Sequence, residues 1–173
     1  MNGKGGTACR PRGPAPTAQR VHATSRQLIE ILGLAPLPEE GGFFRVTWRG
    51  QHGSAILFLI TAGNFSALHR IAEDELWHFH AGDPVEHVRI DPGTGALTLH
   101  QLGTDVARGE IPQLAVPAGH WQGARLAATA HGYALLGCTV TPPWTPAGFA
   151  LGDRGALTSA FPRHAAVITR FTR

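Results

Sequence analysis

Short apolar segments, separated by glycine, proline and aspartate, follow one another through the middle of the chain. They are rich in Val, Ile, Leu, Phe, Thr and Trp, and they span residues 43–49, 54–61, 75–80, 85–90, 96–101, 114–117 and 133–141. Asp-Pro-Gly-Thr-Gly at positions 91–95 is a strong turn signal between two of them. Many short strands at this spacing, with no helix-length periodic segment among them, predict an all-β sandwich or barrel.

Helical patterns occur only near the two ends of the chain. Thr24 and Gln27 have the spacing of a capping box, an apolar face follows, and Gly33 ends the segment. Asp153 is a candidate N-cap for a second helix that runs to Phe161, and a last helical turn or two follows it. We therefore expect short peripheral helices at both ends of the domain, packed outside the barrel.

Composition and charge favour one soluble domain with a small tail. The 173 residues suit a single core, and the longest apolar run, residues 55–60, is too short to span a bilayer. Residues 1–23 are basic and lack apolar periodicity, so we predict a disordered tail there and one domain over residues 24–173. Two cysteines give no disulfide framework, and no secretory h-region is present, which favours a cytoplasmic protein.

The net charge of +3 belongs to the tail rather than to the body. The first 25 residues carry four basic side chains and no acid, whereas the remaining 148 carry 11 arginines and 12 acids. A nucleic-acid face would need arginines interleaved with aromatic residues on one element, and these arginines are scattered. We expect neither a nucleic-acid partner nor a membrane partner.

The stretch from Gly63 to Gly82 carries the candidate chemistry. Alternate residues of a strand face the same side, so His69 and Ile71 are expected to point together into the barrel. Glu75 then opens the next inward-facing set, which continues with Trp77 and Phe79. In contrast, His78 and His80 have the opposite parity and are expected to face outward or toward a partner.

This stretch resembles the first cupin motif, in which glycine, His-x-His, glutamate and glycine recur at fixed spacing. Gly63, His69, Glu75 and Gly82 fall in register, and Ile71 stands at the second histidine. Pro-Ala-Gly at positions 117–119 matches the second motif, with Gln122 in place of its histidine. Further segments are similar to one bacterial and fungal cupin family of unknown function, at residues 37–43, 66–70, 75–79, 117–122 and 149–151.

That resemblance implies the fold and the assembly, but no established reaction. It implies a double-stranded β-helix, the RmlC-like cupin jelly-roll barrel, similar in fold to the dTDP-sugar 3,5-epimerases and the seed storage globulins. It also implies a homodimer, for which the strand-like run at residues 43–49 is the candidate shared edge. The adjacent Glu39 and Glu40 are interpreted as part of a turn before this strand.

The leading hypothesis is a small-molecule-binding cupin, with His69 and Glu75 as catalytic residues of a non-redox isomerase, epimerase or lyase. A buried His–carboxylate pair provides an oriented base with a shifted pKa. Position 122 is expected to converge with positions 69 and 75 in one cavity. The candidate ligand-binding residues are Ile71, Trp77, Phe79, His120, Gln122, Arg70 and Arg125.

Two alternatives stay open. In the first, a divalent metal serves a dioxygenase or lyase and is held by His69, Glu75 and Gln122, with His120 as a further ligand of the same strand parity as Gln122. A typical metal cupin uses three histidines and one glutamate, so this chain offers a weaker donor set. The second alternative is a non-catalytic ligand-binding or storage-like protein, because one fold hosts many functions.

Overall fold

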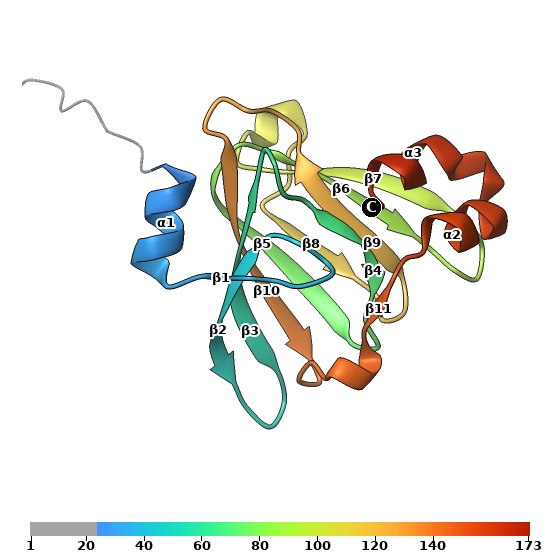
Figure 1. Ribbon diagram of the computed structural model, residues 1–173, viewed down its shortest axis with the longest axis horizontal. Coiled ribbons are helices and arrows are strands. Elements are labelled where there is room, and N and C mark those ends of the chain that lie inside the picture. The colour runs from blue at the N-terminus through green and yellow to red at the C-terminus, as the bar shows by residue number, and fades with distance from the viewer. Residues whose placement is uncertain (1–23) are drawn as a thin grey trace, which may run out of the picture.

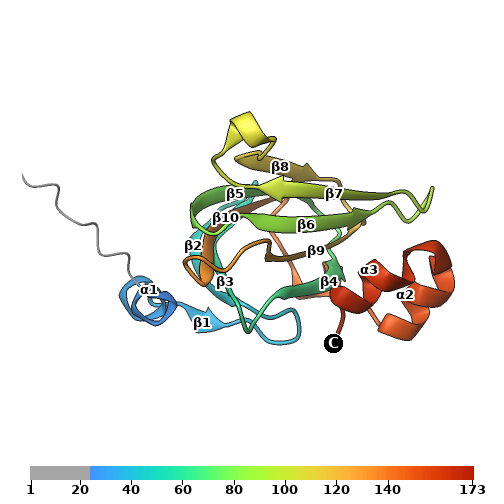
Figure 2. The same ribbon diagram turned by 90° about the horizontal axis from the view of Figure 1, so that it is seen from above.

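The computed structural model describes residues 24–173, so the predicted tail at residues 1–23 lies outside the described residues. Two antiparallel sheets face each other in a jelly roll (Figures 1 and 2). The six-stranded sheet has the order β1 (Ala35–Pro36), β2 (Phe43–Arg49), β3 (Ser54–Thr61), β10 (Tyr133–Thr141), β5 (Asp74–Gly82) and β8 (Gln113–Val116). The five-stranded sheet has the order β11 (Ala150–Leu151), β4 (Ser66–Arg70), β9 (Trp121–Leu126), β6 (Val85–Ile90) and β7 (Leu97–Leu102).

The all-β prediction is confirmed, and several strand boundaries agree with it. Residues 43–49, 54–61, 85–90 and 133–141 form strands with the expected bounds. The strands β5, β7 and β8 begin or end one or two residues away from the expected positions. The two-residue strands β1 and β11 were not predicted, because a pairing of that length leaves no periodic pattern.

The helices lie outside the two sheets, as expected. The capping box of α1 (Ser25–Leu32) is formed by Thr24 and Gln27, and Gly33 ends the helix with a left-handed φ of 61°. At the other end, Asp153 caps α2 (Arg154–Ala160), and α3 (Ala165–Arg170) follows. Figures 1 and 2 place α1 and the α2–α3 pair at opposite ends of the molecule. No helix of residues 24–173 is long and apolar enough to cross a membrane.

Three apolar clusters hold these layers together. The largest fills the space between the sheets and includes Phe58, Trp77 and Leu136. A second cluster packs α2 and α3 on the outer face of the five-stranded sheet, and a third packs α1 on the outer face of the six-stranded sheet. Since each helix covers an outer face, one interior remains between the sheets, and it is lined by the alternate, inward-facing residues of the strands.

Candidate functional site

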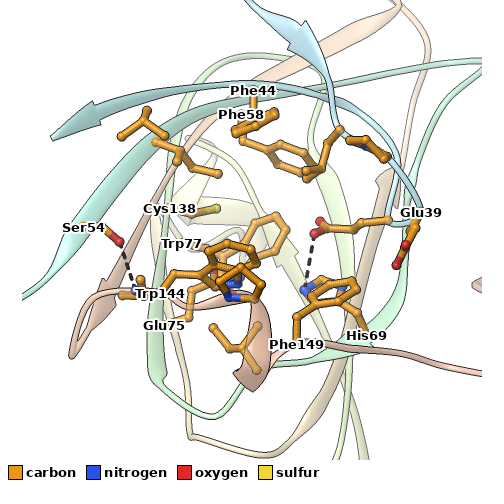
Figure 3. Close-up of a pocket in the computed structure, with 18 of the residues that line it drawn as sticks. Glu39, Phe44, Ser54, Phe58, His69, Glu75, Trp77, Cys138, Trp144 and Phe149 are labelled. Atoms are coloured by element: carbon orange, nitrogen blue, oxygen red, sulfur yellow. Dashed lines mark hydrogen bonds and ion pairs between the residues drawn. The ribbon is translucent and has the colours of Figure 1, made fainter. Parts of the chain in front are cut away.

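A cavity of about 540 Å³ opens into the interior between the strands of the six-stranded sheet and two loops. One loop comprises residues 37–40, between β1 and β2, and the other comprises residues 144–149, just before β11. Inward-facing residues of β2, β3, β5 and β10 form most of the wall, which is largely apolar. The polar groups that reach the cavity are few, and His69 and Glu75 are among them (Figure 3).

His69 is held in one orientation and one tautomer. It lies on β4 and is 3% exposed, and its ring stacks on Phe149 with centroids 5.7 Å apart. Its Nδ1 lies 2.8 Å from the carbonyl oxygen of Ala67. A carbonyl oxygen can only accept, so Nδ1 carries the proton and the neutral ring has its lone pair at Nε2. That lone pair is therefore the group able to accept a proton.

Glu75 lies on β5, is 7% exposed, and has a strongly shifted pKa. The pKa of the carboxyl is raised from 4.5 to about 7, mainly because the group is buried and in part because the Glu40 carboxylate is near. His69 and hydrogen bonds from Gln122 and Cys138 act in the opposite direction and lower it. Near pH 7 this carboxyl is therefore divided between its protonated and ionised forms, so it can both donate and accept a proton.

A buried amide fixes the Glu75 carboxylate. Trp77 Nε1 donates to Gln122 Oε1 at 2.9 Å, and an indole nitrogen can only donate, so the amide orientation is determined. Gln122 Nε2 then donates to Glu75 Oε2 at 2.5 Å. His87 Nε2 lies 3.4 Å from the same amide oxygen, and burial lowers the pKa of this histidine to about 3, so it is neutral. Gln122 thus positions Glu75 from behind the cavity wall.

Glu40 is the functional residue that the sequence interpretation missed. The sequence was interpreted only as a turn at this position. In the structure, the Glu40 side chain reaches the cavity and is 13% exposed. Its Oε1 accepts from Ser66 Oγ at 2.7 Å, and its Oε2 lies 3.8 Å from His69 Nε2 (dashed line at His69 in Figure 3). A proton taken up at Nε2 would therefore face a carboxylate. The site consists of His69, Glu75 and Glu40.

The loop that presents Glu40 is fixed by contacts from the far end of the chain. Arg173 Nη1 donates to the carbonyl oxygens of Glu39 and Glu40 at 2.5 and 2.8 Å, and Nη2 donates to Asn64 and Phe65. A Cβ on Gly41 would lie 2.0 Å from this guanidinium, and its φ of 98° excludes most side chains. Close packing between glycine and arginine therefore holds the loop against the barrel.

Replacing Arg173 with alanine is expected to lower the free energy of unfolding by about 2 kcal/mol, because several hydrogen bonds from a charged donor are lost together. Glu40 should lose its fixed position at the same time. Urea unfolding measures the stability, and Arg163→Ala, at an exposed position, is the matched control. Equal stability of the two variants would contradict the bracing role of Arg173.

The comparisons with known proteins agree with this fold. The family model described as Cupin superfamily (DUF985) matches residues 26–152. The chain belongs to this family. A protein from Shewanella oneidensis is 36% identical, with 88% of this chain and 99% of that chain covered and a TM-score of 0.82. A hypothetical protein from Leishmania major is 31% identical, with 87% and 99% covered and a TM-score of 0.81.

More distant cupins share the fold alone. A cupin-2 domain protein from Rhodospirillum rubrum is 14% identical, with 80% of this chain and 87% of that chain covered and a TM-score of 0.59. No protein of curated function matches the chain. The cupin fold of this chain is therefore shown.

The structure brings together part of the predicted set of site residues. His69, Ile71, Glu75 and Trp77 all line the cavity of this cupin. Phe79 does not line the cavity. It is the next inward-facing residue of β5 after Trp77, and it packs against the core between the sheets. Residues 78 and 80 have the opposite parity, as expected, and His78 bonds to Thr139 and Gln113 on neighbouring strands.

Four further candidates also lie outside the cavity lining. Gln122 is fully buried and touches Glu75 from behind, so it supports the site without lining it. His120 lies directly before β9, and its Nε2 is 3.9 Å from Oδ1 of Asp91. The guanidinium groups of Arg70 and Arg125 stack on aromatic rings of their neighbours, Trp121 and Phe65. His120 and the two arginines, predicted as ligand-binding residues, therefore do not line this cavity.

The donor set does not fit a transition metal. Ile71 puts hydrocarbon where a typical metal cupin has its second histidine, and the Gln122 amide is already bound to Trp77 and Glu75. Between residues 24 and 173, no three His, Cys, Asp or Glu side chains are arranged to hold a metal ion. The alternative of a metal-dependent enzyme thus gains no support from the residues present.

Proposed function

We propose that this cupin binds a small, largely apolar molecule in the cavity and catalyses a proton transfer on it, as a non-redox isomerase, epimerase or lyase. The observation that carries the proposal is a carboxyl with a pKa of about 7, Glu75, in the same apolar cavity as Nε2 of His69, whose Nδ1 is held by the carbonyl oxygen of Ala67. General acid–base groups act best when their pKa lies near the working pH. An imidazole nitrogen and a carboxyl that titrates near pH 7, in one apolar cavity, suit proton abstraction next to a carbonyl.

In this mechanism each group has a separate task. His69 Nε2 removes a proton from carbon, and Glu40 stabilises the imidazolium that forms, since its carboxylate is the nearest anion. Protonated Glu75 then donates its proton to the developing oxyanion or to the opposite face of the carbon. Gln122 holds Glu75 in place during both steps. The apolar wall excludes water, which strengthens these interactions.

The proposal is tested by deuterium exchange at carbon. The full-length protein is incubated in D₂O with a panel of small carbonyl compounds, and mass spectrometry measures the deuterium incorporated. We expect exchange into one class of compound, slowed at least about 100-fold in His69→Ala and in Glu75→Gln. His80→Ala, on the outward face of β5, is the matched control and should exchange like the natural protein. Exchange by His69→Ala at the natural rate would contradict the proposal.

We further propose that the protein is a homodimer joined along β2. The short β1 pairs only with Phe43 and Phe44, so the remainder of β2 presents an open edge on that side. Trp48 on this edge is 50% exposed. A second copy would cover the unpaired edge. Sedimentation is expected to show a particle of twice the 18.4 kDa chain mass. The Trp48→Glu variant should sediment increasingly as a monomer. If the natural protein sediments only as a monomer, the proposed dimer is wrong.

A further inference from the structure

We infer that the cavity selects a cationic ligand, a protonated amine or a quaternary ammonium group carried on an apolar body. The inference rests on the proposed function, because it concerns the same cavity and names the charge class of the molecule bound there. Three features carry it: the excess of carboxylates, the aromatic wall, and the lack of an arginine or lysine partner for the two inner carboxylates.

The charged groups that line the cavity are mainly acidic. Glu39, Glu40 and Glu75 line it, whereas the basic side chains of the lining are Arg49 and His69. Arg49 donates to the carbonyl oxygen of Trp144 at 2.9 Å and is exposed. Arg173 lies close to the loop but directs its guanidinium at carbonyl oxygens and at Asn64. An anionic ligand would thus meet carboxylates, with no cluster of arginines to hold it.

Aromatic side chains surround the cavity. Phe44, Phe58, Trp77, Trp144 and Phe149 all line it, and Figure 3 shows them around the space between Glu75 and His69. The face of an aromatic ring carries negative potential, so a cation near such faces is attracted, and the attraction grows as water is removed. Aromatic walls next to carboxylates are a typical environment for ammonium groups. They are a poor environment for a phosphate or a carboxylate.

The two inner carboxylates have no arginine or lysine partner, and His69 is the basic side chain beside them. Glu40 Oε2 lies 3.8 Å from His69 Nε2, an ion pair only when the ring is protonated, and Oε1 accepts from the neutral Ser66. Glu75 accepts from the neutral amide of Gln122. Within residues 24–173, no arginine or lysine forms an ion pair with either group. Buried carboxylates are costly without a counter-charge, and an ammonium ligand would supply it.

Binding of a cation should then depend on pH through Glu75. The groups that face this carboxyl are His69 on β4, Glu40 on its loop, Cys138 on β10 and Gln122 on β9. Without a ligand, burial raises the pKa of Glu75 to about 7, and a cation beside it would favour the ionised form. Protons are therefore released on binding, and the affinity for a cation should rise between pH 6 and pH 8. The proposed acid step then uses the fraction of the complex in which Glu75 keeps its proton.

Three aromatic probes of similar size but different charge test the inference: 2-phenylethylamine, 2-phenylethanol and 3-phenylpropanoate. Calorimetry or tryptophan fluorescence measures their affinities for the full-length protein at pH 6 and pH 8. We expect the amine to bind at least tenfold more tightly than the alcohol at pH 8, and the propanoate to bind most weakly. The affinity for the amine should rise roughly tenfold from pH 6 to pH 8, whereas that for the alcohol should not change.

Variants connect this selectivity to the carboxylates. Glu40→Gln and Glu75→Gln should each weaken amine binding about tenfold and leave alcohol binding unchanged, with circular dichroism to check that both fold. Glu86→Gln, at a carboxylate that pairs with Arg170 outside the cavity, is the control. Equal affinities for amine and alcohol, tightest binding of the propanoate, or no binding of any probe would overturn the inference. Selective amine binding without deuterium exchange would instead count against the proposed reaction alone.

Discussion

Replacing Glu75 with glutamine is expected to raise the free energy of unfolding at pH 8 by about 3 kcal/mol. Burial raises the pKa of this carboxyl from 4.5 to about 7, so at pH 8 the folded protein holds a charge that opposes folding. Each unit of pKa difference between the folded and unfolded states corresponds to about 1.4 kcal/mol. Glutamine has the same shape, can still accept from Gln122, and carries no charge.

The pH dependence has a defined sign. Above pH 4.5 the unfolded chain has released the Glu75 proton, while the folded protein retains it up to about pH 7. The native protein therefore loses stability relative to the variant across this range, and the difference is constant at higher pH. Urea unfolding at several pH values between 5 and 8, with Glu86→Gln as the control, measures it. A difference that does not depend on pH would show that Glu75 is not titrating from a buried state.

The sequence predicted most of the fold because hydrophobic alternation and turn residues are local signals. β2, β3, β6 and β10 have the predicted bounds, and α1 has both of its predicted caps. β4 and β9 were located only through the motif residues that they carry, since each is a short strand with few strong β-formers. β1 and β11 depend on pairing with distant strands, and a local pattern does not report such pairing.

The inward-facing residues of the site were predicted from strand parity. His69 and Ile71 on one side, and Glu75 and Trp77 on the other, reach the cavity because alternate residues of each strand face inward. Phe79 has the same parity but lies deeper, next to a register shift between β5 and β10 at Leu135 and Leu136, and there it packs into the core. Strand parity therefore identified which residues face inward, but not which of them line the cavity and which pack deeper in the core.

Glu40 could not be located by parity, because its position is set by tertiary contacts. Ser66 binds its carboxylate, and Arg173 holds its backbone from the other end of the chain. The loop also needs a φ of 63° at Glu39, which an extended-chain interpretation does not anticipate. The available signal was the Gly41-Gly42 pair directly after two acids, since consecutive glycines permit close approach of a loop to its neighbours.

Replacing Ile71 with histidine is expected to convert the cavity into a divalent-metal site. Ile71 lines the same cavity as His69 and Glu75, so a histidine there would add the second imidazole that a typical metal cupin has. The Glu40 carboxylate, near His69, is available as a further oxygen ligand. Two imidazoles with a carboxylate suit Ni²⁺ or Mn²⁺ far better than one imidazole does, and we expect Ni²⁺ affinity in the micromolar range or tighter.

Because Ni²⁺ would bind only the folded protein at this site, the gain in unfolding free energy on adding Ni²⁺ measures the new metal site. At a Ni²⁺ concentration 100 times the dissociation constant, the Ile71→His protein should gain about 2.7 kcal/mol of unfolding free energy. Ile71→Leu, which keeps the side-chain volume, is the control and should show no gain. Adding Glu75→Gln to Ile71→His should remove most of the gain, because a charged ligand is lost. If Ile71→His and Ile71→Leu respond equally to Ni²⁺, the side chain at position 71 does not converge with His69 and Glu75.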